Sequence, residues 1–166
     1  VTSVEFSLNG DRLYVGGVDN EIQVYNIGAG KLEETISGHQ DTVSGLQLSF
    51  DGSYLMSFSF DETVRIWDVR QGVQLGKRLK KTLSGQVQGN DKVLIRGGWS
   101  LDGLYACSGS ADRCVYIWDT TTRKIVQRLG GHHGTVNQAC LGKQNWLASC
   151  SIDKTVIVSQ LPEIFL

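Results

Sequence analysis

The sequence predicts an all-β protein built from four similar units of antiparallel strands. Apolar residues alternate with polar ones in short runs, turn pairs such as Asp51-Gly52 separate these runs, and the same order of runs and turns recurs along the chain. The best-preserved copy covers residues 38–68, GHQDTVSGLQLSFDGSYLMSFSFDETVRIWD. It begins with Gly-His, ends with Trp-Asp and carries Asp61 six residues before Trp67.

The first copy, residues 1–26, contains three predicted strands at residues 1–7, 13–17 and 22–25. Tyr25-Asn26 stands where the second copy has Trp67-Asp68. The segment KLEETI that follows is short enough to form an outer strand before the Gly-His of the second copy.

The third copy is GWSLDGLYACSGSADRCVYIWD, residues 98–119, and the segment GQVQGND at residues 85–91 precedes it where a Gly-His pair is expected. The fourth copy, residues 131–160, regains Gly131-His132 but has Ser159-Gln160 in place of Trp-Asp. One aspartate in each copy, Asp19, Asp61, Asp112 or Asp153, occupies the same turn, and successive positions differ by 42, 51 and 41 residues.

This period, with four strands per unit and both dipeptides, resembles the WD-repeat family. The resemblance implies a β-propeller of about four four-stranded antiparallel blades, approximately residues 1–37, 38–84, 85–130 and 131–166. Because the family usually closes its ring with about seven blades, we expect the chain to be roughly the C-terminal half of a ring. Its start inside a strand pattern, without a preceding Gly-His or a signal-peptide pattern, and its end about six residues after a third strand agree with this expectation.

The composition is that of an ordinary globular protein: 166 residues, 40% hydrophobic, 20% charged, net charge -1. The near-neutral charge argues against a dedicated nucleic-acid binder, and no apolar run approaches the roughly 18 residues of a membrane span. The cysteines show no zinc-ligand spacing, so we expect reduced core residues and neither a metal nor a cofactor; they are Cys107, Cys114, Cys140 and Cys150.

His39, Ser57 and Asp61 include the residue types of a nucleophilic triad, which raises the hypothesis of a hydrolase. A catalytic triad would occur once, whereas these positions recur in the other copies. In the WD-repeat family the matching positions form a buried hydrogen-bond chain from the Trp indole through Ser and His to the turn Asp, because buried indole and imidazole groups need partners. The resemblance therefore favours a structural network, formed by His39, Ser57, Asp61, Trp67, Ser108, Asp112, Trp118, His132, Ser149 and Asp153. The first copy has Val15 and Tyr25 at the Ser and Trp positions, so we expect its network to be weak or absent.

Propeller function is usually carried by exposed loops at one face of the ring. The residues that precede the turn aspartates or follow the Gly-His pairs should lie there, and together with Arg70 they form a candidate protein-binding surface: Val18, Gln40, Thr42, Phe60, Arg70, Ala111, His133, Thr135 and Ile152. The alternative is that the apolar members are scattered singly. A basic cluster, Lys77, Arg78, Lys80 and Lys81, could contact RNA phosphates without sequence specificity or an acidic protein surface, or could simply belong to a solvated outer strand.

A narrower resemblance is carried by GSADRCVYIWDTTTRKIVQRLGGHHGTVN (109–137), GGVDNEIQVYNI (16–27) and GSYLMSFSFDETVRIWDVR (52–70). These runs resemble the WD-repeat proteins of the spliceosomal U5 particle, with a departure at Tyr25-Asn26. The resemblance implies a nuclear, non-enzymatic scaffold in pre-mRNA splicing. Its expected partners are spliceosomal proteins, above all the large central U5 protein, with no membrane and no small-molecule substrate.

Two alternatives stay open. The run from Ser57 to Arg70 ends in Trp67-Asp68-Val69-Arg70 and resembles the WDxR box of substrate receptors of cullin–RING ubiquitin ligases, in which Arg70 would contact the ligase adaptor. A signalling β-subunit propeller is the more distant alternative. Substitution of Arg70 by alanine would distinguish the receptor hypothesis from the spliceosomal one.

Overall fold

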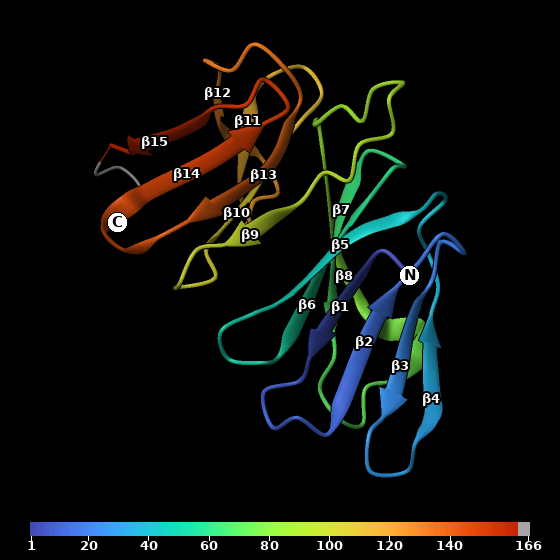
Figure 1. Ribbon diagram of the computed structural model, residues 1–166. Coiled ribbons are helices and arrows are strands. Elements are labelled where there is room, and N and C mark those ends of the chain that lie inside the picture. Colours follow the sequence, from blue (N-terminus) through green and yellow to red (C-terminus); the bar gives the residue numbers. More distant parts are fainter. Residues whose placement is uncertain (163–166) are drawn as a thin grey trace. The chain divides into compact units, whose positions relative to one another are not determined.

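The computed structural model describes residues 1–162, in which strands dominate and the helical segments are two 3₁₀ turns, η1 (Leu75–Lys77) and η2 (Lys143–Asn145). The chain divides into two compact units, Val1–Ser84 and Gly85–Leu166. Figure 1 labels the strands of each unit. Within the described residues, no helix has the length and apolar character needed to cross a lipid bilayer. Residues 163–166, which the sequence assigned to the fourth blade, lie outside the described part of the chain.

The first unit begins with a four-stranded antiparallel sheet. Its strands are β1 (Ser3–Phe6), β2 (Arg12–Gly16), β3 (Ile22–Asn26) and β4 (Lys31–Ile36), in the order β1-β2-β3-β4. Between β2 and β3, Asn20 adopts a left-handed conformation with φ of 66°. Asparagine tolerates this conformation better than most residues, so the Asp-Asn pair forms a tight hairpin turn.

The second sheet repeats the same plan. It contains β5 (Val43–Leu48), β6 (Tyr54–Ser59), β7 (Thr63–Asp68) and β8 (Leu79–Ser84), again antiparallel and in chain order. The register places Ser57 opposite Arg65 and Leu55 opposite Trp67. Because side chains alternate along a strand, Leu55, Ser57 and Trp67 share one face of this sheet.

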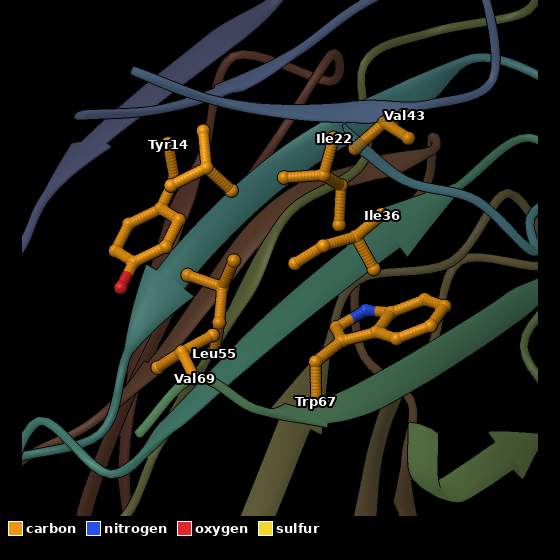
Figure 2. Packing of buried hydrophobic residues seen from close by; sticks show 8 residues of the cluster. Tyr14, Ile22, Ile36, Val43, Leu55, Trp67 and Val69 are labelled. Atoms are coloured by element: carbon orange, nitrogen blue, oxygen red, sulfur yellow. The ribbon is translucent and has the colours of Figure 1, made fainter. Parts of the chain in front are cut away.

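The core of the first unit contains buried side chains from both of its sheets. Figure 2 shows Tyr14 and Ile22 of the first sheet close to Val43, Leu55 and Trp67 of the second. Trp67 is 2% exposed. Burial of each such large apolar side chain contributes roughly 1.5–3 kcal/mol. The cluster as a whole comprises Tyr14, Ile22, Val24, Ile36, Val43, Leu55, Trp67 and Val69.

The second unit also contains two antiparallel sheets. One has four strands, β9 (Gly97–Trp99), β10 (Tyr105–Ser108), β11 (Val115–Asp119) and β12 (Ile125–Leu129). The other has three within the described residues, β13 (Val136–Leu141), β14 (Trp146–Ser151) and β15 (Val156–Gln160). A second apolar cluster, made of Cys107, Val115, Ile117, Val136, Ala139, Leu147 and Leu161, forms the core of this unit.

The predicted fold class is confirmed in its strand content and topology: the described residues are all-β and form successive antiparallel sheets. The expectation of four four-stranded sheets holds for three of them, because the described residues supply only three strands to the fourth. The prediction of core cysteines was correct for Cys107 and wrong for Cys140, which is exposed on β13. Burial raises the pKa of the Cys107 thiol to about 12. Cys114 and Cys150 are half-buried.

Candidate functional site

Four side chains of the second sheet form one continuous hydrogen-bond chain. His39 precedes β5, Ser57 lies on β6, Asp61 in the β6–β7 turn and Trp67 on β7. The Trp67 indole N–H donates to Ser57 Oγ at 2.8 Å, His39 Nε2 lies 2.6 Å from the same oxygen, and His39 Nδ1 lies 2.8 Å from Asp61 Oδ2. A Cβ at Gly38 would lie only 2.9 Å from Trp67 Cη2, so the residue before His39 must be glycine for the imidazole to reach this position.

The protonation states of this chain follow from its surroundings. Burial lowers the pKa of His39 below its ordinary value, so the imidazole is neutral at neutral pH. Burial by itself would raise the pKa of Asp61, but hydrogen bonds from His39, Thr63 and the backbone N–H of Gln40 outweigh it and hold that pKa well below the ordinary range. A neutral His39 that donates a hydrogen bond from Nδ1 to this carboxylate can only accept one at Nε2. The Ser57 hydroxyl donates the hydrogen bond that Nε2 accepts.

The Ser57 hydroxyl, which would be the nucleophile of a hydrolase, is already engaged in hydrogen bonds within this chain. Ser57 is 0% exposed, and its side-chain oxygen is occupied by both the indole and the imidazole. A substrate therefore has no route to this oxygen without opening the sheet. The hydrolase hypothesis for His39 and Ser57 lacks an accessible nucleophile, and what the geometry supplies is cohesion between two neighbouring strands, the turn that joins them and the segment before β5.

The fourth sheet holds a shorter version of the chain. His132 Nε2 lies 2.9 Å from Ser149 Oγ, and its Nδ1 lies 3.0 Å from Thr155 Oγ1 and 3.3 Å from Asp153 Oδ2. The Asp153 carboxylate also accepts from Thr155 and from the backbone N–H of His133, and these hydrogen bonds, that of Thr155 above all, hold its pKa well below the ordinary range. Because Ser159 stands at the position of the Trp, no indole extends this chain.

In the third sheet the turn aspartate has different partners. Asp112 Oδ2 accepts from Tyr116 Oη and from Arg128 Nη2, each at 2.7 Å. The Tyr116 ring stacks on Trp118 with 5.8 Å between ring centroids, and burial together with the hydrogen bond to Asp112 raises the pKa of Tyr116 to about 12. Ser108 Oγ donates instead to the carbonyl of Gly109. The structure therefore does not bring Ser108, Asp112 and Trp118 into a histidine-centred chain.

Sequence reasoning missed the residue that replaces histidine in this sheet. Gln86 follows Gly85 and is 6% exposed, like the histidines that follow Gly38 and Gly131. The three glycines share one feature. A Cβ on each would lie within 4 Å of the side chain located four residues after the turn aspartate, which is Arg65, Tyr116 or Ile157, although the side chain nearest to Gly85 is that of Ile125. Within the described residues, the Oε1 atom of Gln86 has no hydrogen-bond partner. The sequence placed the segment 85–91 where a Gly-His pair is expected, and its Gly-Gln pair was the available signal for Gln86.

The first sheet also carries a replacement. Tyr25 Oη donates to Gln23 Oε1 at 2.9 Å, and Gln23 Nε2 donates to Asp19 Oδ2 at 3.2 Å. Gln23 and Tyr25 lie on the same strand, where alternate side chains share one face. The expectation of a weak or absent network did not anticipate this second solution, which needs neither histidine nor serine.

On the first unit, the predicted surface residues at the tight turns are accessible to different degrees. Val18 is 72% exposed, Gln40 is exposed, and Phe60 and Thr42 are half-buried. The backbone N–H of Phe60 donates to the carbonyl of Thr42 at 2.9 Å, so these two residues are held side by side. Val18 therefore exposes a larger fraction of its side chain to solvent than Phe60 does.

On the second unit, Ile152 is 50% exposed, His133 is exposed and Ala111 is half-buried. Thr135 is only 7% exposed, so its assignment to the surface was wrong. Its carbonyl accepts from the backbone N–H of Ile152 at 3.0 Å, as that of Thr42 accepts from Phe60 in the second sheet.

The basic cluster was also wrong in one of its members. Arg78 is buried and forms an ion pair with Glu34, with 2.7 Å between Nη2 and Oε2, while its Nη1 donates to the carbonyl of Asp68 at 2.8 Å. A guanidinium bound in this way is not available to RNA phosphates. Lys77 and Lys80 are exposed and Lys81 is half-buried, and Lys80 Nζ lies 3.5 Å from Asp68 Oδ2.

Arg70, the last residue of the WDxR run, is bound within its own sheet. Its Nε and Nη2 donate to the two oxygens of Asp68 at 2.9 and 2.6 Å, and its guanidinium lies 5.7 Å from the centroid of the Tyr54 ring. The hydrogen bond from Arg70 lowers the pKa of Asp68 to about 2. The Arg70 side chain remains 56% exposed.

Repeated antiparallel sheets, with a turn aspartate in each and a Trp-Ser-His-Asp chain in one of them, define a WD-repeat protein. The family model "WD domain, G-beta repeat" matches residues 1–26, 30–68, 78–119 and 123–158, and the chain belongs to this family.

The chain is 41% identical over 162 residues to the human "U5 small nuclear ribonucleoprotein 40 kDa protein", covering 97% of the chain and 45% of that protein. The Dictyostelium discoideum protein of the same name is 41% identical over 97% of the chain and 46% of its own length. The "Pre-mRNA-splicing factor cwf17" of Schizosaccharomyces pombe is 32% identical over 97% of the chain and 47% of its length. The chain thus spans about half the length of these curated relatives.

Proposed function

We propose that the protein is a non-catalytic scaffold of the pre-mRNA splicing machinery and acts in the nucleus as a component of the U5 small nuclear ribonucleoprotein. The observation that carries this proposal is 41% identity over 97% of the chain to proteins named as U5 components in human and Dictyostelium discoideum. The similarity to a splicing factor of fission yeast supports the same role. The match covers all four copies, including the one with Tyr25-Asn26, and is therefore broader than the shared dipeptides of the family.

The chemistry of the buried chain supports a scaffold rather than an enzyme. The residues that resemble a triad are buried and saturated by one another, and a similar chain recurs in the fourth sheet. In this proposal the sheets are four blades with approximate limits 1–37, 38–84, 85–130 and 131–166 of a larger ring of about seven. The exposed turn residues of each unit are then contacts for the large central U5 protein, with Val18 as an exposed apolar contact on the first unit and Ile152 on the second.

A tagged full-length protein tests the role. We expect it to co-purify with spliceosomal proteins and U5 RNA at mild salt concentration, and recovery without them would overturn the assignment. The docking surface is tested by Val18→Asp and Ile152→Asp, which should release the central U5 protein. The matched control is Leu32→Asp, at a residue that is 47% exposed on the outer strand β4. If the control releases the partner equally, the turn residues are not the docking surface.

The receptor of a cullin–RING ligase remains the second candidate because Arg70 is half-exposed at the end of a WDxR run. Its guanidinium, however, is already bound by both oxygens of Asp68. In the receptor hypothesis Arg70→Ala removes the ligase adaptor from the purified complex. In the splicing hypothesis the same variant retains its spliceosomal partners.

A further inference from the structure

The second unit contains a pocket of about 200 Å³ between its two sheets. One wall is the β9–β10 hairpin, which includes Leu101 and Asp102, and the other is the β13–β14 loop at residues 142–145. The buried side chains of Ile117 and Leu161 line it and belong to the apolar core of this unit. The pocket therefore lies directly over the apolar core of this unit, and Leu101, which is 49% exposed, adds an accessible apolar side chain to a rim that also carries polar residues.

Both walls of the pocket are held in fixed conformations. In the β13–β14 loop, Gln144 and Asn145 have φ of 55° and 60°, so two successive non-glycine residues adopt the left-handed conformation. The Asn145 carbonyl accepts from the backbone N–H of Leu161 at 2.9 Å, which fastens the loop to a residue of the core. Left-handed non-glycine residues cost conformational energy and tend to cluster where a loop is shaped for binding.

The opposite wall is equally ordered. Ser100 Oγ donates to Asp102 Oδ1 at 2.5 Å, and the same carboxylate oxygen accepts from the backbone N–H of Leu104 at 2.9 Å. The Asp102 carboxylate is thus engaged within its own turn. Lys143 is exposed on the other rim and forms no ion pair within residues 1–162, so a partner meets a positive charge on the β13–β14 side of the pocket and the negative charge of Asp102 on the β9–β10 side.

The size of the pocket indicates its occupant. Small-molecule sites usually occupy about 300–1,000 Å³, more than this pocket offers. Pockets that receive a single aromatic or large aliphatic side chain are typical of protein–protein interfaces, where such anchors supply most of the affinity. Single-stranded RNA would need a groove of several cations and stacking platforms, whereas the rim has one available cation, Lys143, among the described residues that line it.

We propose that this pocket receives one phenylalanine or leucine side chain of a protein partner, and that an acidic residue beside this anchor pairs with Lys143. The proposal rests on the proposed role as a protein-binding scaffold and adds to it a second contact site, formed by the β9–β10 hairpin and the β13–β14 loop. These segments lie at the ends of the strands opposite to Ala111 and Ile152, because each strand runs between the two ends of its sheet.

Fluorescence anisotropy with the full-length protein tests the proposal. The probes are fluorescein-labelled heptapeptides, Gly-Ser-Glu-Phe-Glu-Ser-Gly and the same peptide with alanine at the centre. We expect the phenylalanine peptide to bind about tenfold more tightly. Lys143→Glu should weaken its binding about threefold and should favour a peptide in which lysines replace the glutamates. The matched control is Lys154→Glu, an exposed lysine in the β14–β15 turn, which should leave binding unchanged.

Leu141→Trp adds volume to the lining of the pocket and should abolish the preference for the phenylalanine peptide. If this variant fails to fold, the Lys143→Glu variant still tests the proposal, because it changes only an exposed side chain. Three results would overturn the proposal: equal binding of the two peptides, equal loss in Lys143→Glu and Lys154→Glu, or displacement of the peptide by single-stranded oligouridylate. A protein that co-purifies with spliceosomal proteins yet fails these tests would retain its proposed function and lose this site.

Discussion

The indole N–H of Trp67 donates a hydrogen bond to Ser57 Oγ with 2.8 Å between the two atoms, inside the apolar core of the first unit. The same oxygen lies 2.6 Å from His39 Nε2. One buried hydroxyl thus satisfies two large side chains from different segments of the chain. Because the indole N–H and His39 Nε2 would otherwise be buried without a hydrogen-bond partner, the serine has an effect on stability that its size alone does not suggest.

We expect Ser57→Ala to destabilise the full-length protein by roughly 2–4 kcal/mol, because it leaves the Trp67 indole N–H and His39 Nε2 without a hydrogen-bond partner. The matched variant is Ser149→Ala, which removes a partner from His132 alone and should cost about 1–2 kcal/mol. Urea unfolding, followed by tryptophan fluorescence, measures both. Equal losses in the two variants would show that the Trp67 hydrogen bond contributes nothing to stability.

Arg78→Ala should destabilise the protein by about 3–5 kcal/mol, because the variant leaves the Glu34 carboxylate, whose side chain is only 13% exposed, without its cation. Lys80→Ala is the control from the same strand, and its partly exposed ammonium should contribute less than about 1 kcal/mol. The midpoint of urea unfolding distinguishes the two. A small effect of Arg78→Ala, accompanied by loss of RNA from the purified complex, would restore the hypothesis of a basic RNA-binding cluster.

Gly109→Ala should cost about 3 kcal/mol or more, because a Cβ there would lie 2.1 Å from the Val136 carbonyl oxygen, a backbone atom that cannot move aside easily. Gly76→Ala is the control: no atom lies within 4 Å of the position that its methyl group would take, and the change should stay within about 1 kcal/mol. Thermal unfolding of the two variants provides the comparison. Similar melting temperatures would mean that β10 and β13 can separate at no cost.

Stability should decrease on acidification from about pH 7.5 to about pH 5. The pKa of His39 is lowered by burial, so below its ordinary pKa of 6.5 the unfolded chain binds more protons at this residue than the folded one. The pKa of Asp61 is depressed below 3.8, so its stabilising effect is retained across this range and is lost only under more acidic conditions. Urea unfolding as a function of pH measures the slope.

His39→Gln should flatten this pH dependence, whereas His133→Gln, at an exposed position, should preserve it. The comparison separates the buried imidazole from a general effect of histidine protonation. An unchanged slope in His39→Gln would mean that His39 does not supply the linked proton.

The repeat pattern was sufficient to predict the fold, because strands and tight turns are encoded by residues close together in the sequence. The turn aspartates and the Gly-His and Trp-Asp pairs marked each copy, and the strands lie where their alternation indicated. The four members of the chain in the second sheet could be named in advance because that copy has lost none of the family's residues. The pattern carried no information on the substitutes, Gln23 and Tyr25 in one sheet and Tyr116 and Arg128 in another, because these belong to no common motif.

Burial of individual polar residues could not be predicted in the same way. Arg78 stands in the sequence as one of four neighbouring cations, and only the approach of Glu34 from β4 makes it a buried ion pair. Thr135 follows a Gly-His pair as Thr42 does, yet its turn encloses it. Such differences depend on side chains that are distant in the sequence and approach only after the sheets have packed.

Local periodicity and the spacing within one repeat were enough to determine the class of protein, the number of repeated units and the residues of the best-preserved hydrogen-bond chain. Packing alone established that Gln86 is buried after its glycine, that Arg78 is structural, and that a pocket is present between the two sheets of the second unit. These features form between segments that are distant in the sequence and have no common sequence motif. The geometry of such a contact is fixed only when both segments have packed against each other.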